Sequence, residues 1–233
     1  MQPIHVIARR LLRAPHDEEA WLVFADWLLD RGDPRGEWLV LHHQLSEPSL
    51  RGRQRLAIER RLREAGPPTE EELLEELDLH GMWWVINVNA RRGFILGLTL
   101  AWMRELTLEC LERVAAHPAG TLWSALSVSG LGSADTARLV HTDALADRAV
   151  LDIAQPRAYK ARIGAAGAHT LASASRLRHL EVLRVGGNDI GSEGAVALVQ
   201  SPHLADLRVL DLGANGLDDA GFERVTSQAG LAR

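Results

Sequence analysis

The chain has 233 residues, 46% of them hydrophobic, and a formal net charge of −5. This length and composition exclude a mainly disordered chain and fit one large globular domain or two smaller ones. The negative charge argues against general affinity for nucleic acid or anionic lipid.

The N-terminal residues contain no apolar core long enough for a signal peptide, and no window approaches the ~20 apolar residues of a membrane helix. Cys110 is the only cysteine, which excludes an intrachain disulfide and indicates a reducing compartment. We therefore expect a cytoplasmic protein with no membrane contact. Lys160 is the only lysine among 26 basic residues, a bias typical of a GC-rich bacterial genome.

The first 66 residues predict a small helical domain. Trp21, Phe24 or Ala25, and Leu28 recur at helical spacing, and Asp17 is suited to cap this helix. Helix-breaking and helix-starting residues separate the predicted helices. Gly32 ends the first helix, Asp33 and Pro34 open a second over about 35–45, and a third follows over 53–65.

Residues 24–37 read FADWLLDRGDPRGE. This string resembles a small bacterial repeat-companion domain that precedes leucine-rich repeats, in which an Ala-Asp-Trp-Leu helix runs into an Arg-Gly-Asp-Pro-Arg-Gly-Glu turn. The resemblance spans about residues 5–47. It implies a helical domain, 1–66, placed ahead of a repeat array.

The charges around this turn allow two interpretations. Capping and pairing among Asp26, Arg31, Asp33, Arg35 and Glu37 would be purely structural, because Asp33 precedes Pro34 at a helix start. Alternatively, Asp26, Trp27 and Arg35 form a recognition patch that faces a partner.

Residues 67–92 predict a connecting helix and a capping strand, after a boundary at Gly66, Pro67 and Pro68. Thr69 and Glu72 have the spacing of a capping box. Residues 82–89 are rich in strand-forming side chains and are expected to pair with residues 94–100, which would cover the N-terminal edge of the repeats.

Two segments of the C-terminal half repeat at a spacing of 27, at 180–190 and 207–217. Both follow L-x-x-L-x-L-x-x-N-x-L, where the central apolar residues point inward from a short strand. Asn188 is expected to turn its amide onto backbone groups after that strand. One such unit cannot bury its own apolar face, so the pattern predicts stacking.

Upstream the register loosens, with residues 155–162 inserted. The predicted strand positions are Leu98, Leu126, Leu151, Leu183 and Leu210, at spacings of 28, 25, 32 and 27. These units resemble ribonuclease-inhibitor-like leucine-rich repeats. The expected fold is therefore α/β, a leucine-rich-repeat solenoid of about five strand–helix repeats over residues 93–233, preceded by the small all-helical domain.

The resemblance implies a non-catalytic adaptor or scaffold that binds a protein partner of unknown identity through the concave face of the repeats. The residues expected on that face alternate with the buried positions and include Thr99, Ser127, Asp152, Arg184 and Asp211. We expect no cofactor, because phosphate-binding loops, nucleophile elbows and metal-ligand spacings are missing from the sequence. A homodimer through the uncapped C-terminal repeat is a further hypothesis.

Two alternatives remain open. An enzyme site at the junction of the N-terminal domain and the repeats would use Asp26, Glu37 and His42 as acid–base groups. RNA binding would use the Arg-rich segment 51–63, although Glu59 and Glu64 interrupt it and its apolar residues suggest a packed helix. Cys110 is expected to be buried and inert.

Overall fold

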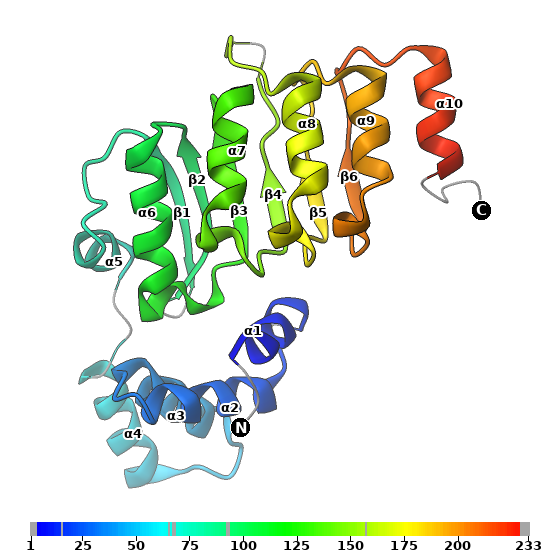
Figure 1. Cartoon of the computed structure of the whole chain (residues 1–233). Helices are drawn as coiled ribbons and strands as arrows, with labels where there is room; N and C mark the ends of the chain where they lie inside the picture. Colours follow the sequence, from blue (N-terminus) through cyan, green and yellow to red (C-terminus); the bar gives the residue numbers. More distant parts are fainter. Residues whose placement is uncertain are drawn as a thin grey trace. The chain divides into compact units, whose positions relative to one another are not determined.

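A computed structural model describes residues 4–14, 16–64, 66, 69–91, 94–156 and 158–228 (Figure 1). The chain divides into two compact units. The first comprises residues 1–80, 90–95 and 116–122, and the second comprises residues 81–89, 96–115 and 123–233. Of the expected domain boundaries, Pro67, Pro68 and Gly93 lie outside the described residues.

Helices and strands alternate over most of the described chain. The α-helices are α1 (Ile4–Arg13), α2 (Glu18–Leu29), α3 (Pro34–Ser46), α4 (Gly52–Glu64), α5 (Glu70–Glu76), α6 (Glu105–Ala116), α7 (Ser133–His141), α8 (Gly164–Ser173), α9 (Gly191–Val199) and α10 (Asp219–Gln228). The strands are β1 (Val85–Arg91), β2 (Phe94–Ala101), β3 (Ala125–Ser129), β4 (Val150–Asp152), β5 (Val182–Arg184) and β6 (Val209–Asp211). Short 3₁₀ helices are η1 (Pro118–Leu122), η2 (Asp143–Leu145), η3 (Ser175–Leu177) and η4 (Pro202–Leu204).

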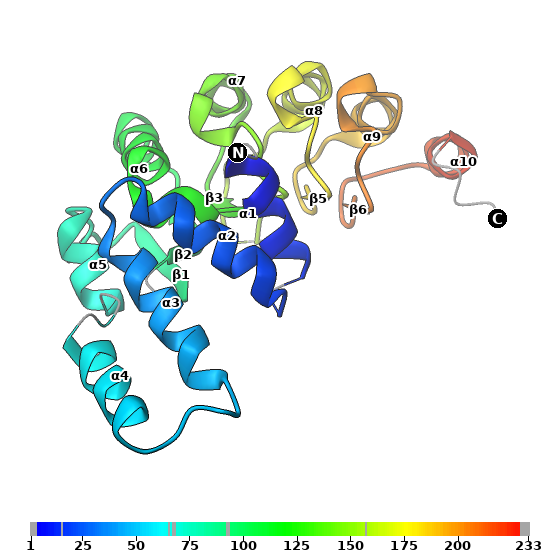
Figure 2. The ribbon, with the colours of Figure 1, turned by 90° about the horizontal axis from the view of Figure 1, so that it is seen from below.

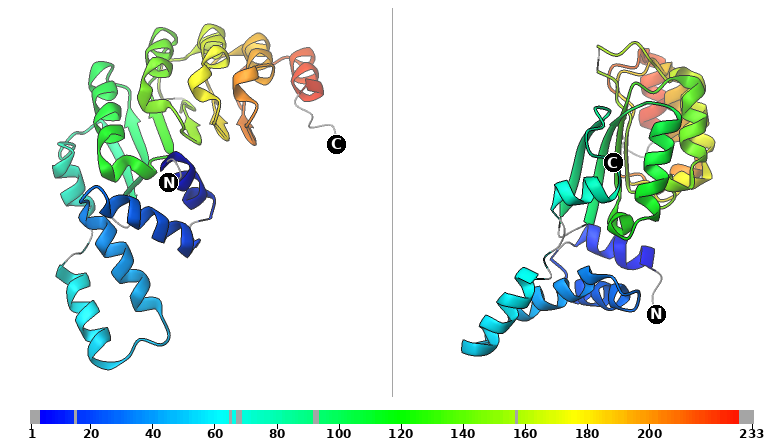
Figure 3. Two further views of the ribbon diagram at one scale, coloured as in Figure 1. Left: turned by 60° about the horizontal axis from the view of Figure 1, so that its bottom comes forward. Right: turned by 90° about the vertical axis from the view of Figure 1, so that its left-hand side faces the viewer.

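In the first unit α2 packs on both α1 and α3, and α4 packs on α3 (Figure 3). The start of α2 is as expected, because the Asp17 side chain accepts a hydrogen bond from the Ala20 N–H at 3.0 Å. The predicted apolar face of α2 is buried. Helix α1 was not predicted, although Ile7, Ala8 and Leu11 are buried at helical spacing.

The turn between α2 and α3 is closed by a buried ion pair. Both oxygens of Asp33 accept hydrogen bonds from the Arg35 guanidinium, at 2.8 and 2.6 Å, and Oδ1 also caps α3 through the Arg35 N–H. The guanidinium lies 5.2 Å from the centre of the Phe94 ring, which in turn contacts Phe24. A Cβ on Gly36 would lie 2.8 Å from the Ala25 carbonyl oxygen, so only glycine allows α3 to approach α2 this closely.

The expected connecting elements are present with shifted bounds. The Thr69 and Glu72 capping box forms at the start of α5. The strand expected at 82–89 begins at Val85, because residues 82–84 form a turn in which Trp83 is 75% exposed. Strand β1 pairs with β2, as predicted, and only two residues separate them, too few for the crossover that a parallel pair requires.

Strands β1 to β6 follow one another in a single sheet, and β2 to β6 are parallel. The five predicted strand positions lie opposite one another across the sheet: Leu98, Leu126, Leu151, Leu183 and Leu210. The first four of these leucines are at most 2% exposed, and they face the helices. The spacing of 32 is absorbed in the segment after β4, so the register of the sheet is unaffected.

Helices α7 to α10 pack each against the next and form one layer, which lies along one face of the sheet (Figures 1 and 2). Small residues set the distance between helices, since a Cβ on Gly194 would lie 2.9 Å from the Cβ of Ala168. The turns are tied together by Asn188, whose Nδ2 donates to the carbonyls of Ile153 and Val185 at 2.8 and 3.0 Å. The predicted role of this amide is confirmed.

Candidate functional site

The open face of the sheet, on the side away from the helices, carries all five residues that the sequence singled out there. The register pairs each with the next, so they form one row across β2 to β6: Thr99, Ser127, Asp152, Arg184 and Asp211. Asp211 is exposed and the other four are half-buried. A single polar row therefore crosses the second unit from one repeat to the next.

Charge in this row is concentrated on the last three strands. Arg184 lies between the two aspartates in the register, and its Nη1 is 3.8 Å from Oδ2 of Asp152. Each aspartate also accepts a hydrogen bond from the backbone of its own turn, Asp152 from Ala154 and Asp211 from Gly213. The carboxylates are thereby oriented, and the guanidinium, whose side chain is 43% exposed, keeps donors for an external acceptor.

A second row runs beside the polar one and is apolar. It consists of Gly97, Ala125, Val150, Val182 and Val209, paired by the same register. Side chains increase in size from glycine to valine along this row, and Val209 is 45% exposed. An apolar strip flanked by ordered charges is the composition expected of a protein-binding surface.

Tyr159 is a candidate that sequence reasoning missed. It lies in the inserted segment after β4, is 37% exposed, and its hydroxyl accepts a hydrogen bond from Ser129 at 3.3 Å. Its ring packs beside the backbone of Gly130, where φ is +83°. Nearby, Trp102 carries a buried Nε1 with no hydrogen-bond partner among the described residues. The sequence feature that could have identified Tyr159 is its position as an aromatic residue within the segment inserted between two repeats.

Gln155, in the same segment, joins neighbouring repeats. Its Oε1 accepts a hydrogen bond from the Gly130 N–H at 2.9 Å, and its Nε2 donates to the Ile153 carbonyl. In the next repeats Asn188 and Asn215 have the equivalent role. Gln155 lies four residues after Leu151, whereas the two asparagines lie five residues after Leu183 and Leu210, so the sequence pattern did not identify it.

The N-terminal recognition patch is only partly consistent with the structure. Asp26 is exposed, and Trp27 is half-buried against Phe24 with the Arg31 guanidinium 3.8 Å from its ring centre. Arg35 was expected to face a partner, and this is wrong: it is 7% exposed because both Asp33 oxygens and the Phe94 ring hold it inside the first unit.

Of the three groups proposed for an enzyme site, Asp26 is exposed, and Glu37 and His42 contact neighbouring side chains. Glu37 pairs with Arg61 of α4, and the His42 ring lies 5.0 Å from the Trp38 ring in the same helix. Cys110 is buried, as expected, and this burial raises the pKa of its thiol to about 11. Among the described residues no group of three histidine, cysteine or acidic side chains could hold a metal ion.

The Arg-rich helix α4 is less packed than expected. None of its residues is buried and Leu56 is 65% exposed, so the prediction of a packed apolar face is wrong for Leu56. Two of its arginines pair with carboxylates four residues away, Arg55 with Glu59 and Arg60 with Glu64. These pairs reduce the positive charge that the helix presents to a polyanion.

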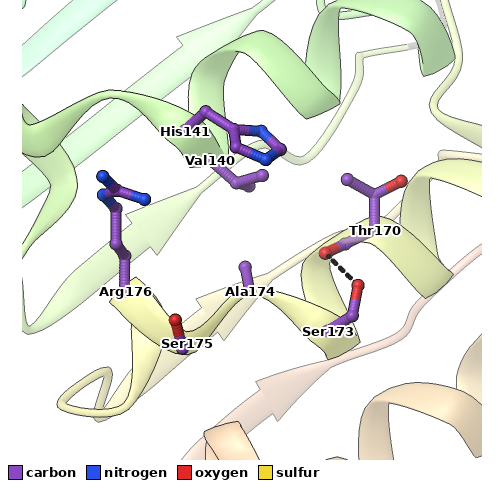
Figure 4. A pocket seen from close by; sticks show the side chains of 7 residues that line it. All are labelled: Val140, His141, Thr170, Ser173, Ala174, Ser175 and Arg176. Carbon is purple, nitrogen blue, oxygen red and sulfur yellow. Dashed lines mark hydrogen bonds between the residues drawn. The ribbon is translucent and has the colours of Figure 1, made fainter.

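A small pocket of about 130 Å³ lies between α7 and α8 (Figure 4). His141, Thr170, Ser173 and Arg176 line it together with smaller side chains, and the Ser173 hydroxyl donates to the Thr170 carbonyl within its own helix. Arg176 pairs with Asp143 at 2.6 Å. The pocket is bordered by the carboxyl ends of two helices, where the helix dipoles oppose an anionic ligand.

Comparison with known protein families gives a match for one part of the chain. Residues 176–199, which include β5 and α9, match the family model of the leucine-rich repeat. No curated protein matches the chain. Leucine-rich repeats in general act as protein-interaction modules, which gives this protein a general class of function. None of the described helices is long and apolar enough to span a bilayer.

Proposed function

We propose that the protein is a non-catalytic adaptor that binds a protein partner through the open face of β2 to β6. In this proposal the five strand–helix units form a ribonuclease-inhibitor-like solenoid, and the open face is its concave surface. Residues 1–66 are a repeat-companion domain, as the string at 24–37 suggests. The protein is cytoplasmic and bacterial, and takes no cofactor.

The observation that carries the proposal is the in-register row of Asp152, Arg184 and Asp211 beside the apolar row that ends at Val209. Apolar contact supplies affinity, whereas an alternating row of fixed charges supplies register and partner choice. A partner segment that places a carboxylate opposite Arg184 and a cation opposite Asp152 or Asp211 would pair with the charges of this row. Tyr159 extends this surface with an aromatic anchor of the kind that is enriched in interfaces.

The test is affinity purification of the tagged chain from a related bacterial host, followed by identification of the retained proteins. Arg184→Glu should lower retention of a specific partner by about tenfold, because it places like charges together. Arg176→Glu is the matched control: it reverses the same charge and breaks a comparable surface ion pair, to Asp143, away from the open face.

Equal retention by both variants would contradict the open-face proposal and direct attention to Asp26 and Trp27 of the first unit. Both variants should keep the helical circular dichroism of the parent, since each altered side chain is partly exposed. A partner lost by Arg184→Glu, kept by Arg176→Glu and recovered by a compensating charge on the partner would establish the site.

A further inference from the structure

The last repeat leaves an apolar groove open between β6 and α10. This terminal groove has a volume of about 610 Å³, and its floor is formed by the end of α9. Its lining is almost entirely aliphatic or aromatic: Leu198, Val199, Leu207, Val209, Leu210, Leu212, Leu217, Phe222 and Val225, with Arg208 and Thr226. In Figure 2, α10 stands apart from β6, on the far side of the connecting segment.

The preceding repeat shows what a covered groove looks like. Leu183, Val185 and Ile190 are fully buried there, whereas Leu210, Leu212 and Leu217, each 27 residues later, are only partly buried. The hydrogen bonds of the backbone differ between the two repeats in the same way. The N–H of Val185 donates to Asp211 and that of Gly187 to Gly213, but for Leu212 and Ala214 the described chain contains no following strand. The edge of β6 is therefore ready to accept a strand.

Phe222 argues against coverage by another repeat of the same kind. Its equivalents in the two preceding repeats are Ala195 and Ala168, both 0% exposed. Ala168 faces the next helix so closely that only Gly194 fits opposite it. A phenyl ring at this position, 62% exposed, keeps a further helix from stacking at that distance. An extended segment, which needs only the strand edge and the groove, fits the space.

Charge identifies the chemistry of that segment. Residues 206–226 hold five carboxylates, those of Asp206, Asp211, Asp218, Asp219 and Glu223, against the two guanidiniums of Arg208 and Arg224. Asp219 begins α10, one turn before Phe222, and Asp218 directly precedes it; Asp206 precedes the strand segment that lines the groove, and Asp211 lies within that segment. Two copies of this surface would bring like charges together, which disfavours a homodimer through this repeat. A basic segment is complementary.

We propose that the terminal groove binds an extended segment of a partner protein in which aliphatic and basic residues alternate. The segment pairs with β6 as an added strand, places its aliphatic side chains on Leu210, Leu212 and Phe222, and directs its basic side chains to the acidic rim. This site borders the open face, with which it shares Val209 and Asp211, but it binds by strand addition and does not depend on the function proposed above.

The probe is a fluorescein-labelled peptide of about eight residues that alternates valine or leucine with lysine or arginine, long enough for one strand. Binding to the full chain is measured by fluorescence anisotropy, at peptide concentrations where the free peptide is monomeric. Phe222→Glu, at an exposed position, should weaken binding by about tenfold. Leu106→Glu, which makes the same kind of change at a 50% exposed apolar position of α6, should leave binding unchanged and serves as the matched control.

Two altered peptides test the mechanism on the unmodified protein. N-methylation of alternate backbone nitrogens removes the strand hydrogen bonds, and replacement of the basic residues by glutamate reverses the charge. The proposal requires that each change abolish saturable binding. Equal binding of either altered peptide would overturn it. So would sedimentation of the parent as a dimer that Phe222→Glu converts to monomer, because the groove would then hold a second copy.

Discussion

At the scale of single residues, the charged motif between α2 and α3 is mainly a structural device. Asp33 caps α3 and receives the Arg35 guanidinium, and the guanidinium lies against the Phe94 ring. A buried ion pair of this kind tolerates loss of one member poorly, because the remaining charge has no water to solvate it. The motif thus fixes the crossing of two helices, and only Asp26 and Trp27 are left for recognition.

This ion pair makes stability depend on pH. Burial raises the pKa of Asp33, but the Arg35 guanidinium and the Arg35 N–H lower it more, so that it lies below the ordinary value of 3.8. A lowered pKa in the folded state stabilises the protein above the unfolded value, and that contribution is lost as the pH falls through the folded value. We expect the free energy of unfolding to decrease below about pH 4 for this reason.

The measurement is urea unfolding of the parent and of Asp33→Asn between about pH 6 and about pH 3. The variant should be less stable at the higher pH, and the difference should shrink on acidification. A difference that stays constant across this range would show that Asp33 contributes no proton-linked stability. Asp30→Asn, at the exposed end of α2, is the control for general charge effects.

At the scale of elements, the repeats are set by small residues at fixed positions. Gly194 in α9 faces Ala168 in α8, and Gly167 in α8 faces Thr136 in α7, so each helix approaches its predecessor at a glycine. The strands are simpler, because each of β2 to β6 places a leucine at the same position across the sheet. Neighbouring helices can be no farther apart than the strands they are connected to allow. Side chains larger than glycine at these positions would increase the distance between helices and are therefore expected to destabilise the sheet.

Gly194→Val should therefore destabilise the protein by about 2 kcal/mol or more, since its Cβ would already lie 2.9 Å from that of Ala168 before the branched methyls are added. Urea unfolding measures the loss. Ala168→Gly combined with Gly194→Val should recover part of it, and the coupling in this double-mutant cycle isolates the contact. Glu193→Val, at the exposed neighbouring position, controls for helix propensity; equal losses in both variants would refute the packing argument.

At the scale of the whole chain, the two units use different kinds of organisation. The first is a set of helices around an aromatic core that includes Phe24 and Phe94. The second repeats one strand–helix unit, so each repeat is stabilised by its neighbours, and within the described residues the repeat of β6 and α10 has a neighbour on one side only. Its stability should decrease toward α10, where the terminal groove leaves Leu210 and Leu212 partly exposed.

Amide hydrogen exchange tests this gradient. The N–H of Leu212 should exchange at least about 100-fold faster than the equivalent N–H of Val185, which donates to the Asp211 carbonyl at 3.0 Å. Ile153, which donates to Arg184 at 2.9 Å, is the internal reference for a protected position. Similar protection at Leu212 and Val185 would mean that the edge of β6 is covered in solution.

Much of the local structure could be read from the sequence. Asp17 and Asp33 mark helix starts because a short carboxylate accepts hydrogen bonds from free backbone N–H groups, and this requires only a few neighbouring residues. The strand leucines were equally readable, since a 27-residue repeat defines its own alignment. Helix α1 was missed although its sequence carries the signal, since Ile7, Ala8 and Leu11 recur at helical spacing.

The candidate site depended on tertiary structure. The sequence placed Asp152, Arg184 and Asp211 on strand faces, but only the register across β4, β5 and β6 makes them neighbours. It could not show that Arg35 is buried, because burial requires Phe94, 59 residues away in the chain. Nor could it show that Tyr159 meets Ser129 across an insertion. The sequence by itself determined the repeats, the caps and the turn residues, whose physics is local or periodic. Only the tertiary structure decided which side chains share a surface and where the apolar core remains open.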